Sequence, residues 1–282
     1  MYQAYFGFHQ APFALTPNTE LFHALPPHVE AIQTTLAALT MGEGIIHISG
    51  EVGTGKTLVC RMLIQRLPAH CDLAYIPTPP KEGDELKIAL AIELGLEPPK
   101  DRIALTSQLQ HELIRRKELG RSVVVVLDEA QALSDDCLET IRLLGNLETE
   151  FEKLLQIVLL SQPELDQRLQ QHHLRQLQQR ITFRAQLRAL DLAETVAYIE
   201  HRLYQAGCRL PLFSLPQSKL IWQASNGIPR LINQICHKAL IAASSSQLQM
   251  VGQREILMAI QDTPGARQPR WLFPVPWGWS KA

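Results

Sequence analysis

The chain has 282 residues, of which 46% are hydrophobic and 20% charged, so it can bury a sizeable core and is neither disordered nor fibrous. The net charge is −1, and five scattered cysteines without a CxxC pair exclude a disulfide framework or a zinc site. No apolar run approaches the ~18–20 residues that cross a bilayer, and the start lacks a secretory signal pattern, so we expect a cytoplasmic protein.

The N-terminal part of the chain contains one clear helical pattern. Apolar residues at helical spacing over residues 27–41, followed by Gly42, predict a helix. We therefore expect residues 1–43 to form an N-terminal segment and a helix that lead into the core.

Five short, β-branched and apolar stretches follow, which is typical of strands buried on both faces of a parallel sheet. They lie at residues 44–50, 73–76, 123–127, 156–160 and 181–187. Helical patterns lie between them, for example at residues 56–67, 104–119 and 135–144. This alternation predicts a doubly wound, parallel five-stranded α/β domain over residues 44–190.

The strand patterns stop after residue 187, and only helical patterns follow. Four of them, at residues 192–206, 217–225, 230–244 and 254–261, predict a small all-helical domain over residues 191–262. Asp191, with Glu194 three residues later, forms a variant of the capping box at its start. The tail at residues 263–282 is rich in Pro, Gly and Trp, and we expect it to be irregular because Pro274 and Pro276 exclude a regular helix.

The stretch Gly50 to Thr57 reads Gly-Glu-Val-Gly-Thr-Gly-Lys-Thr and fits the P-loop pattern GxxxxGK[ST] between a predicted strand and a predicted helix. Its backbone N–H groups can point at phosphate oxygens, and the helix N-terminus adds a positive dipole end. Lys56 can neutralise the β- and γ-phosphates of ATP, while the Thr57 hydroxyl can bind Mg²⁺. The predicted ATP-binding residues are Gly50, Glu51, Val52, Gly53, Thr54, Gly55, Lys56, Thr57, Leu58 and Asp128.

Residues 122–129 read Ser-Val-Val-Val-Val-Leu-Asp-Glu, an apolar strand that ends in two carboxylates. Alone, this run could be a strand followed by a solvated turn, but its position after a P-loop favours a Walker B element. Ligands of parallel sheets bind beyond the carboxyl ends of the strands, so Asp128 would hold Mg²⁺ together with Thr57. Glu129 would polarise the attacking water.

These motifs and several others resemble the AAA+ ATPases of the ExeA/GspA type, which serve bacterial secretion and pilus systems, and among them the ATPases of MSHA pilus biogenesis. The resemblance runs from Tyr5 to about Ala243 and implies an AAA+ fold with a helical lid, ATP and Mg²⁺ as cofactors, ATP hydrolysis and a homo-oligomer. Its motifs are Phe6-Gly7-Phe8, Pro12-Phe13, Thr16-Pro17, the P-loop, Asp-Glu-Ala-Gln at 128–131, Asn-Leu-Glu-Thr at 146–149, Gln-Pro-Glu-Leu at 162–165, Gln-Arg-Ile at 179–181 and Gly-Ile-Pro-Arg-Leu-Ile-Asn at 227–233.

The resemblance also implies roles for two polar residues. Gln162 takes the sensor-1 position beside Walker B, where it would orient the water, although it could be an exposed loop residue before Pro163. Ser161 stands where this family is expected to have glycine. Arg230 takes the sensor-2 position at the start of a lid helix, where the alternative is a surface arginine. Gln131, although part of the pattern, has no role that the sequence defines.

The resemblance further implies an arginine finger, which would reach the ATP of a neighbouring subunit and accelerate hydrolysis by ~10³-fold or more. Arg180 lies at the expected place before the last strand, and Arg175 and Arg184 are its rivals. If Arg180 has this role, hydrolysis requires an oligomer.

The expected partners are pilus or secretion-system assembly proteins, including one at the inner membrane. ExeA-type relatives carry a membrane segment and a peptidoglycan-binding module after the ATPase; neither follows within these 282 residues, which favours the MSHA pilus type and an anchor supplied by a partner. A DNA-binding regulator resembling transposition ATPases is the alternative, because residues 181–282 hold 11 Lys or Arg against 5 Asp or Glu. A nucleotide switch with little hydrolysis is a third possibility.

Overall fold

The computed structural model describes residues 2–15, 22–99, 101–150, 152–272 and 275–280, and the chain divides into two units. We call them the sheet unit (residues 28–52 and 56–187) and the helical unit (residues 1–27, 53–55 and 188–282). Each is considered separately below. The Thr16-Pro17 pair of the family pattern lies outside the described residues.

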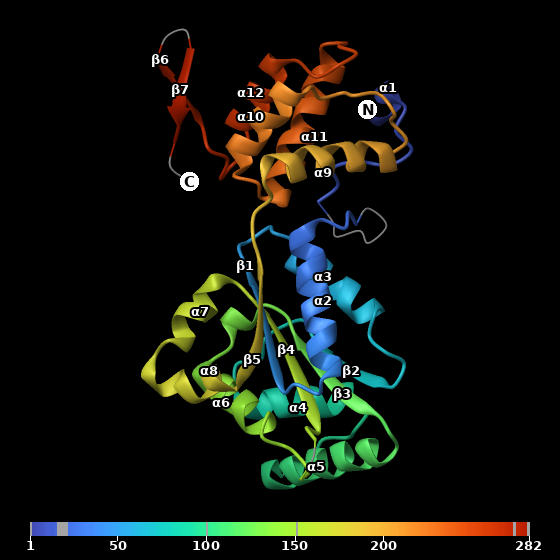
Figure 1. Ribbon diagram of the computed structural model, residues 1–282, viewed down its shortest axis with the longest axis vertical. Helices are drawn as coiled ribbons and strands as arrows, with labels where there is room; N and C mark the ends of the chain where they lie inside the picture. Colours follow the sequence, from blue (N-terminus) through green and yellow to red (C-terminus); the bar gives the residue numbers. More distant parts are fainter. Residues whose placement is uncertain (1, 16–21, 100, 151, 273–274, 281–282) are drawn as a thin grey trace. The chain divides into compact units, whose positions relative to one another are not determined.

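One parallel sheet forms the centre of the sheet unit (Figure 1). Its strands run in the order β2-β3-β4-β1-β5, so that β4 lies between β1 and β3. Because the strands are parallel, the residues that follow β1, β3 and β4 emerge at the same edge of the sheet. The strands are β1 (Ile45–Gly50), β2 (Cys71–Ile76), β3 (Ser122–Leu127), β4 (Leu155–Ser161) and β5 (Ile181–Leu187).

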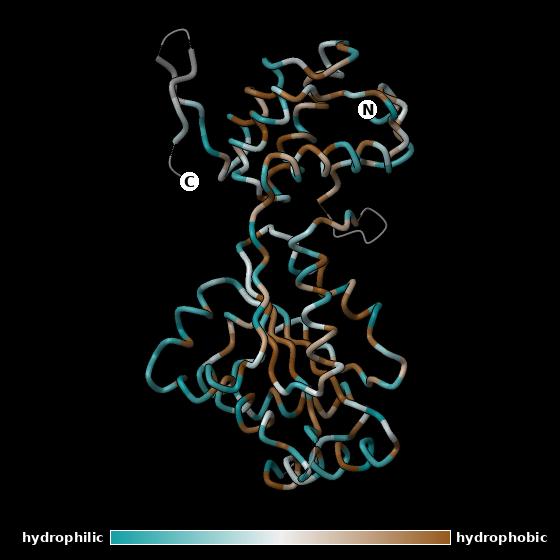
Figure 2. The backbone as a smooth tube through the Cα atoms, in the orientation of Figure 1, coloured by the Kyte–Doolittle hydropathy of each residue, from teal (hydrophilic) through white to brown (hydrophobic). Residues whose placement is uncertain are grey.

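Helices cover both faces of this sheet. Every residue of β1 and of β4 is buried, as expected when both faces are covered, and the hydrophobic residues gather along the strands (Figure 2). On one face, alternate residues such as Val123 and Val125 pack into a core shared with α4, α5, α6, α7 and α8. On the other, Gln156 of β4 donates from Nε2 to the carbonyl of Leu39 in α2, at 2.9 Å. The helices are α2 (Pro26–Thr40), α3 (Lys56–Gln65), α4 (Gly83–Glu93), α5 (Arg102–Glu118), α6 (Asp135–Leu144), α7 (Pro163–Leu169) and α8 (Arg175–Arg180).

The helical unit packs its helices around a second hydrophobic core. The predicted capping box is present, since the Glu194 backbone donates to Asp191 Oδ1 (2.8 Å) and the Asp191 backbone donates to Glu194 Oε2 (2.9 Å). The helices are α1 (Tyr2–Phe6), α9 (Leu192–Gln205), α10 (Leu215–Ser225), α11 (Pro229–Ser245) and α12 (Gln253–Gln261).

The structure divides the predicted N-terminal segment of residues 1–43 between the two units. Tyr2, Phe8 and Phe13 are buried in the core of the helical unit, and the Tyr2 hydroxyl lies 2.9 Å from His237 Nδ1. Burial of aromatic rings is a strong driving force, so these residues pack with the helices even though 160 or more residues separate them in sequence. Residues 28–43 belong to the sheet unit.

The tail is more regular than the sequence suggested. Strands β6 (Pro269–Leu272) and β7 (Val275–Trp279) pair as an antiparallel ribbon, so the expectation of an irregular tail was wrong for these residues. The prolines exclude a helix, but a two-stranded ribbon consists only of edge strands, which tolerate residues without a backbone N–H.

None of the described helices is both long enough and apolar enough to span a bilayer. The five cysteines are free thiols, and four of them are buried.

Candidate functional site

The P-loop follows β1 and leads into α3. Gly53 and Gly55 have φ angles of 87° and 105°, a backbone region that residues with side chains rarely adopt. Lys56, the first residue of α3, is 6% exposed, and its Nζ donates to the carbonyls of Gly50 (2.6 Å) and Glu51 (3.1 Å). Burial lowers the pKa of Lys56, while the nearby carboxylates of Glu129 and Asp128 oppose this effect. The loop therefore holds a desolvated cation that an anionic ligand would stabilise.

Asp128 lies directly after β3 and is 5% exposed. Its Oδ1 accepts a hydrogen bond from the backbone of Glu129 at 2.8 Å, and burial raises the pKa of the carboxyl group. A buried carboxylate that is costly to ionise gains from a nearby cation. Hydroxyl and carboxylate oxygens are the donors that Mg²⁺ prefers, so Asp128 and the Thr57 hydroxyl fit this ion chemically.

Glu129, Gln131 and Gln162 form a closed set of hydrogen bonds. Glu129 Oε2 accepts from Gln131 Nε2 at 2.6 Å and from Gln162 Nε2 at 3.2 Å. The backbone N–H of Gln162 donates to Gln131 Oε1 at 3.0 Å. The structure thus brings Gln162 beside Glu129. The same set of hydrogen bonds includes Gln131, for which the sequence defined no role.

Ser161 and His47 lie beneath this set, on the neighbouring strands β4 and β1. Their Oγ and Nε2 atoms are 2.6 Å apart, Ser161 Oγ donates to the Gln162 carbonyl at 3.0 Å, and His47 Nδ1 lies 3.4 Å from Asp166. Ser161 is 0% exposed, so the arrangement resembles a hydrolase triad only in its residue types and offers no accessible nucleophile. His47 was not predicted from the sequence; the available signal was a single histidine inside an otherwise apolar strand.

The three candidate finger residues occupy different places in the sheet unit. Arg175 and Arg180 are exposed at the two ends of α8, whereas the half-exposed Arg184 lies on β5, 3.8 Å from Asp166. Arg180 is therefore at the surface, and Arg184 is near a carboxylate of its own chain.

Arg230 lies in the helical unit, in the first turn of α11, and is exposed. Its backbone N–H donates to the carbonyl of Gly53, a residue grouped with the same unit, at 3.2 Å. This bond involves the backbone alone and leaves the proposed side-chain role untested.

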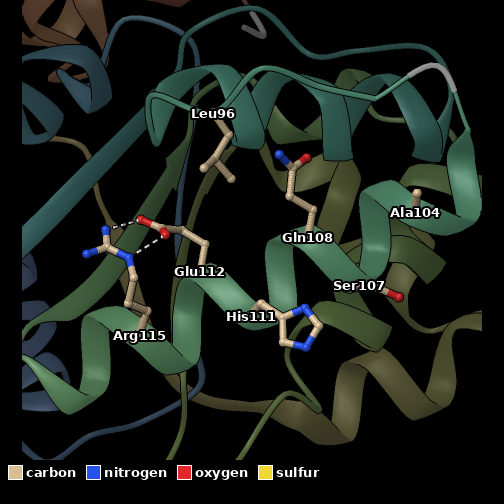
Figure 3. A pocket seen from close by; sticks show the side chains of 7 residues that line it. All are labelled: Leu96, Ala104, Ser107, Gln108, His111, Glu112 and Arg115. Carbon is tan, nitrogen blue, oxygen red and sulfur yellow. Dashed lines mark hydrogen bonds and ion pairs between the residues drawn. The ribbon is translucent and has the colours of Figure 1, made fainter.

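A hollow of about 460 Å³ lies elsewhere in the sheet unit, along α5 (Figure 3). Glu112 and Arg115 on its wall pair with each other at 2.7 and 2.8 Å, and hydrogen bonds from Arg115 and then from Arg116 lower the pKa of Glu112 to about 2. None of the predicted site residues lines this hollow, so it is separate from the strand ends. Its lining is Leu96, Ala104, Ser107, Gln108, His111, Glu112 and Arg115.

The strand order, the P-loop after β1 and the carboxylates after β3 define a class of protein. The chain has the parallel five-stranded P-loop fold of AAA proteins, followed by a helical region. A family model described as an AAA domain matches residues 39–169. The chain therefore carries an AAA nucleotide-binding domain.

The comparison with curated proteins identifies a relative in Aeromonas hydrophila. General secretion pathway protein A is 40% identical over 269 residues, which cover 95% of this chain and 49% of the relative. The chain thus spans about half the length of that protein. The similarity extends beyond the AAA domain into the helical unit.

Solved structures with lower identity share the fold. Cdc6p from Pyrobaculum aerophilum is 18% identical with a TM-score of 0.67, covering 88% of this chain and 69% of that one. The ORC2 protein from Aeropyrum pernix is 15% identical with a TM-score of 0.63, covering 89% and 72%. RuvB from Thermotoga maritima is 15% identical with a TM-score of 0.53, covering 83% and 67%.

Proposed function

We propose that this protein is a Mg²⁺-dependent ATPase. The observation that carries the proposal is the convergence, at one edge of the sheet, of a buried lysine, a buried carboxylate and a second carboxylate held by two amides. Lys56 would neutralise the phosphates, Asp128 and Thr57 would hold Mg²⁺, and Glu129 would accept the proton of the attacking water with Gln162 beside it. Mg²⁺, when bound, would neutralise charge on the phosphate oxygens.

Phosphate release by the purified protein tests this chemistry. We expect release that requires Mg²⁺, stops on addition of EDTA and falls by about 10²-fold or more in Glu129→Gln, because positioned base catalysis has that magnitude. The exposed Glu150 offers a matched control, and Glu150→Gln should keep the full rate. Equal rates in both variants would contradict the proposal.

We infer further that Arg180 completes the site of a neighbouring subunit in a homo-oligomer. Its exposure at the end of α8 and the resemblance to AAA+ proteins support this role. Arg180→Ala and Glu129→Gln should each be inactive alone, yet regain hydrolysis when mixed, because one supplies the arginine and the other the carboxylate. Failure of the mixture to recover, or recovery only with Arg175→Ala or Arg184→Ala, would refute the assignment.

The curated relative supports a proposal for the biological role. Since the Aeromonas hydrophila protein is named for the general secretion pathway, we propose that this ATPase assembles or localises a type II secretion apparatus or a related pilus, of the MSHA kind, with an inner-membrane partner. A Glu129→Gln variant loaded with ATP should retain its partners in a pull-down from the native host. Recovery of secretion or pilus assembly proteins supports the role, whereas recovery of DNA with a transposase contradicts it.

A further inference from the structure

Gln131 lies two residues after Glu129, in the short turn η2 (Ala130–Ala132) that follows β3. We propose that Gln131 is a positioning residue, which fixes the carboxylate of Glu129 and ties it to the end of β4. The inference rests on the proposed function, because it assigns Glu129 the base role in ATP hydrolysis.

The chemistry of the three groups permits only one arrangement of the Gln131 amide. A carboxylate can only accept hydrogen bonds, so Gln131 must turn its Nε2 toward Glu129; a backbone N–H can only donate, so Oε1 must face Gln162. The bond lengths of 2.6 and 3.0 Å agree with both requirements. The side chain of Gln131 thus joins Glu129 to the backbone N–H of the sensor position.

Both described hydrogen bonds to the Glu129 carboxylate end on Oε2, from Gln131 and from Gln162. With Oε2 held by two amide donors, Oε1 is the oxygen that can accept from a water. A carboxylate fixed in this way loses little conformational freedom when the water is bound, which is the condition for efficient positioning.

The backbone of this turn is held in an uncommon conformation. Glu129 has φ 52° and ψ 36°, in the left-handed region that residues other than glycine rarely adopt. Arg168 of α7 braces the turn, since its Nη1 donates to the carbonyls of Gln131 (2.9 Å) and Leu133 (2.8 Å). Backbone strain that surrounding contacts maintain is typical of functional sites.

Only glutamine meets these demands at position 131. Asparagine is one methylene shorter and cannot reach both partners, glutamate would place a second carboxylate against Glu129, and methionine has a similar length but no donor. Gln131→Met therefore removes the two hydrogen bonds and keeps most of the volume. Gln110, exposed on α5, provides the matched control Gln110→Met.

The experiment compares steady-state hydrolysis of ATP and hydrogen exchange for the full chain and these variants. We expect Gln131→Met to lower kcat by about 10-fold or more with KM changed less than about twofold, since a mispositioned base slows only the chemical step. Exchange of the Gln162 backbone N–H should accelerate by about tenfold, because its acceptor is gone. Gln110→Met should change neither quantity.

A double variant separates positioning from a general structural effect. In a Glu129→Gln background, Gln131→Met should cause no further loss of kcat, since Gln131 would act through Glu129. A kcat within twofold of wild type for Gln131→Met, or a full additional loss in the double variant, would overturn the inference while leaving the ATPase proposal intact. A wild-type protein that binds ATP without hydrolysing it would overturn both.

Discussion

Each unit of the molecule buries a cationic side chain, and the two side chains have different kinds of partner. In the helical unit, Arg202 donates to the carbonyls of Pro12 (2.5 Å) and Ala14 (3.2 Å) and to the Tyr198 hydroxyl (3.2 Å). In the sheet unit, Lys56 has two carbonyl partners on the loop itself, and two nearby carboxylates oppose the lowering of its pKa.

The comparison shows that burial of charge does not by itself mark a functional site. Arg202 links the N-terminal segment to α9, so its charge serves packing, and its planar guanidinium suits several fixed acceptors. Lys56 lies at the edge of a parallel sheet, where ligands of such folds bind, next to carboxylates that chemistry could use. The setting of the charge distinguishes the two roles.

The largest expected effect concerns Lys56. Lys56→Met should lower ATP hydrolysis by about 10³-fold, because a charged donor to a developing phosphoryl charge is lost in a site with little water. Equilibrium binding of labelled ATP and phosphate release measure the effect, with Lys219→Met, at an exposed lysine, as the control. Hydrolysis and ATP binding both equal to those of the control would show that Lys56, like Arg202, only stabilises the fold.

The converse effect is expected for Arg202. Arg202→Met leaves the buried carbonyl of Pro12 and the partly buried carbonyl of Ala14 without this donor, and should lower the free energy of unfolding of the helical unit by about 3 kcal/mol, with little change in ATP affinity. Urea unfolding followed by hydrogen exchange in α9 measures it, with Arg209→Met at an exposed site for comparison. A loss of ATP affinity without loss of stability would remove the distinction between the two cations.

A smaller effect is expected at Asp72, which lies at the start of β2, away from the carboxyl ends of the strands, and pairs with Arg116 and Arg121. Hydrogen bonding, chiefly from Arg121, lowers the pKa of Asp72, so its contribution to stability is present above the unfolded pKa of ~3.9 and is lost as the pH falls through the lower folded value. Asp72→Asn should cost about 1 kcal/mol at pH 7, and less below about pH 4.

Urea titrations of wild type, Asp72→Asn and the exposed-site control Glu150→Gln at pH 7 and pH 3 check this behaviour. A cost for Asp72→Asn that does not diminish between the two pH values would contradict the assigned pKa direction. A change in ATP hydrolysis at pH 7 would instead connect this ion cluster with the site.

The sheet could be predicted because its determinants are local. The β-branched runs end in turns or caps, and the predicted bounds of all five strands lie within about two residues of the observed ones. The contacts of residues 2–15 with α9 and α11 could not be predicted, since aromatic residues near the start of a chain do not indicate which distant helices will bury them. The pairing of β6 with β7 was not predicted for a different reason. Prolines weaken the sequence pattern of a strand, but they do not exclude a two-stranded ribbon.

The site, like the fold, was predictable where its residues belong to local sequence patterns. The fixed spacing of the P-loop and the carboxylates after an apolar strand identify Lys56, Asp128 and Glu129, since these patterns reflect one backbone geometry. Gln131 appeared in the sequence only as part of a pattern, because its role depends on a turn that places it between two strand ends. The roles of His47 and Arg168 depend on tertiary contacts. The only local signal for His47 was a histidine within an apolar strand, and Arg168 gave none.

We propose that the carboxyl ends of β1, β3 and β4 together form one centre for ATP hydrolysis. Single-turnover cleavage of γ-labelled ATP by wild type, Glu129→Gln and Gln162→Ala, measured with ATP affinity on the same samples, tests it most directly. We expect that both variants bind ATP as wild type does and that cleavage slows by about 10²-fold or more in Glu129→Gln. Undiminished cleavage by Glu129→Gln, with ATP bound, would contradict it.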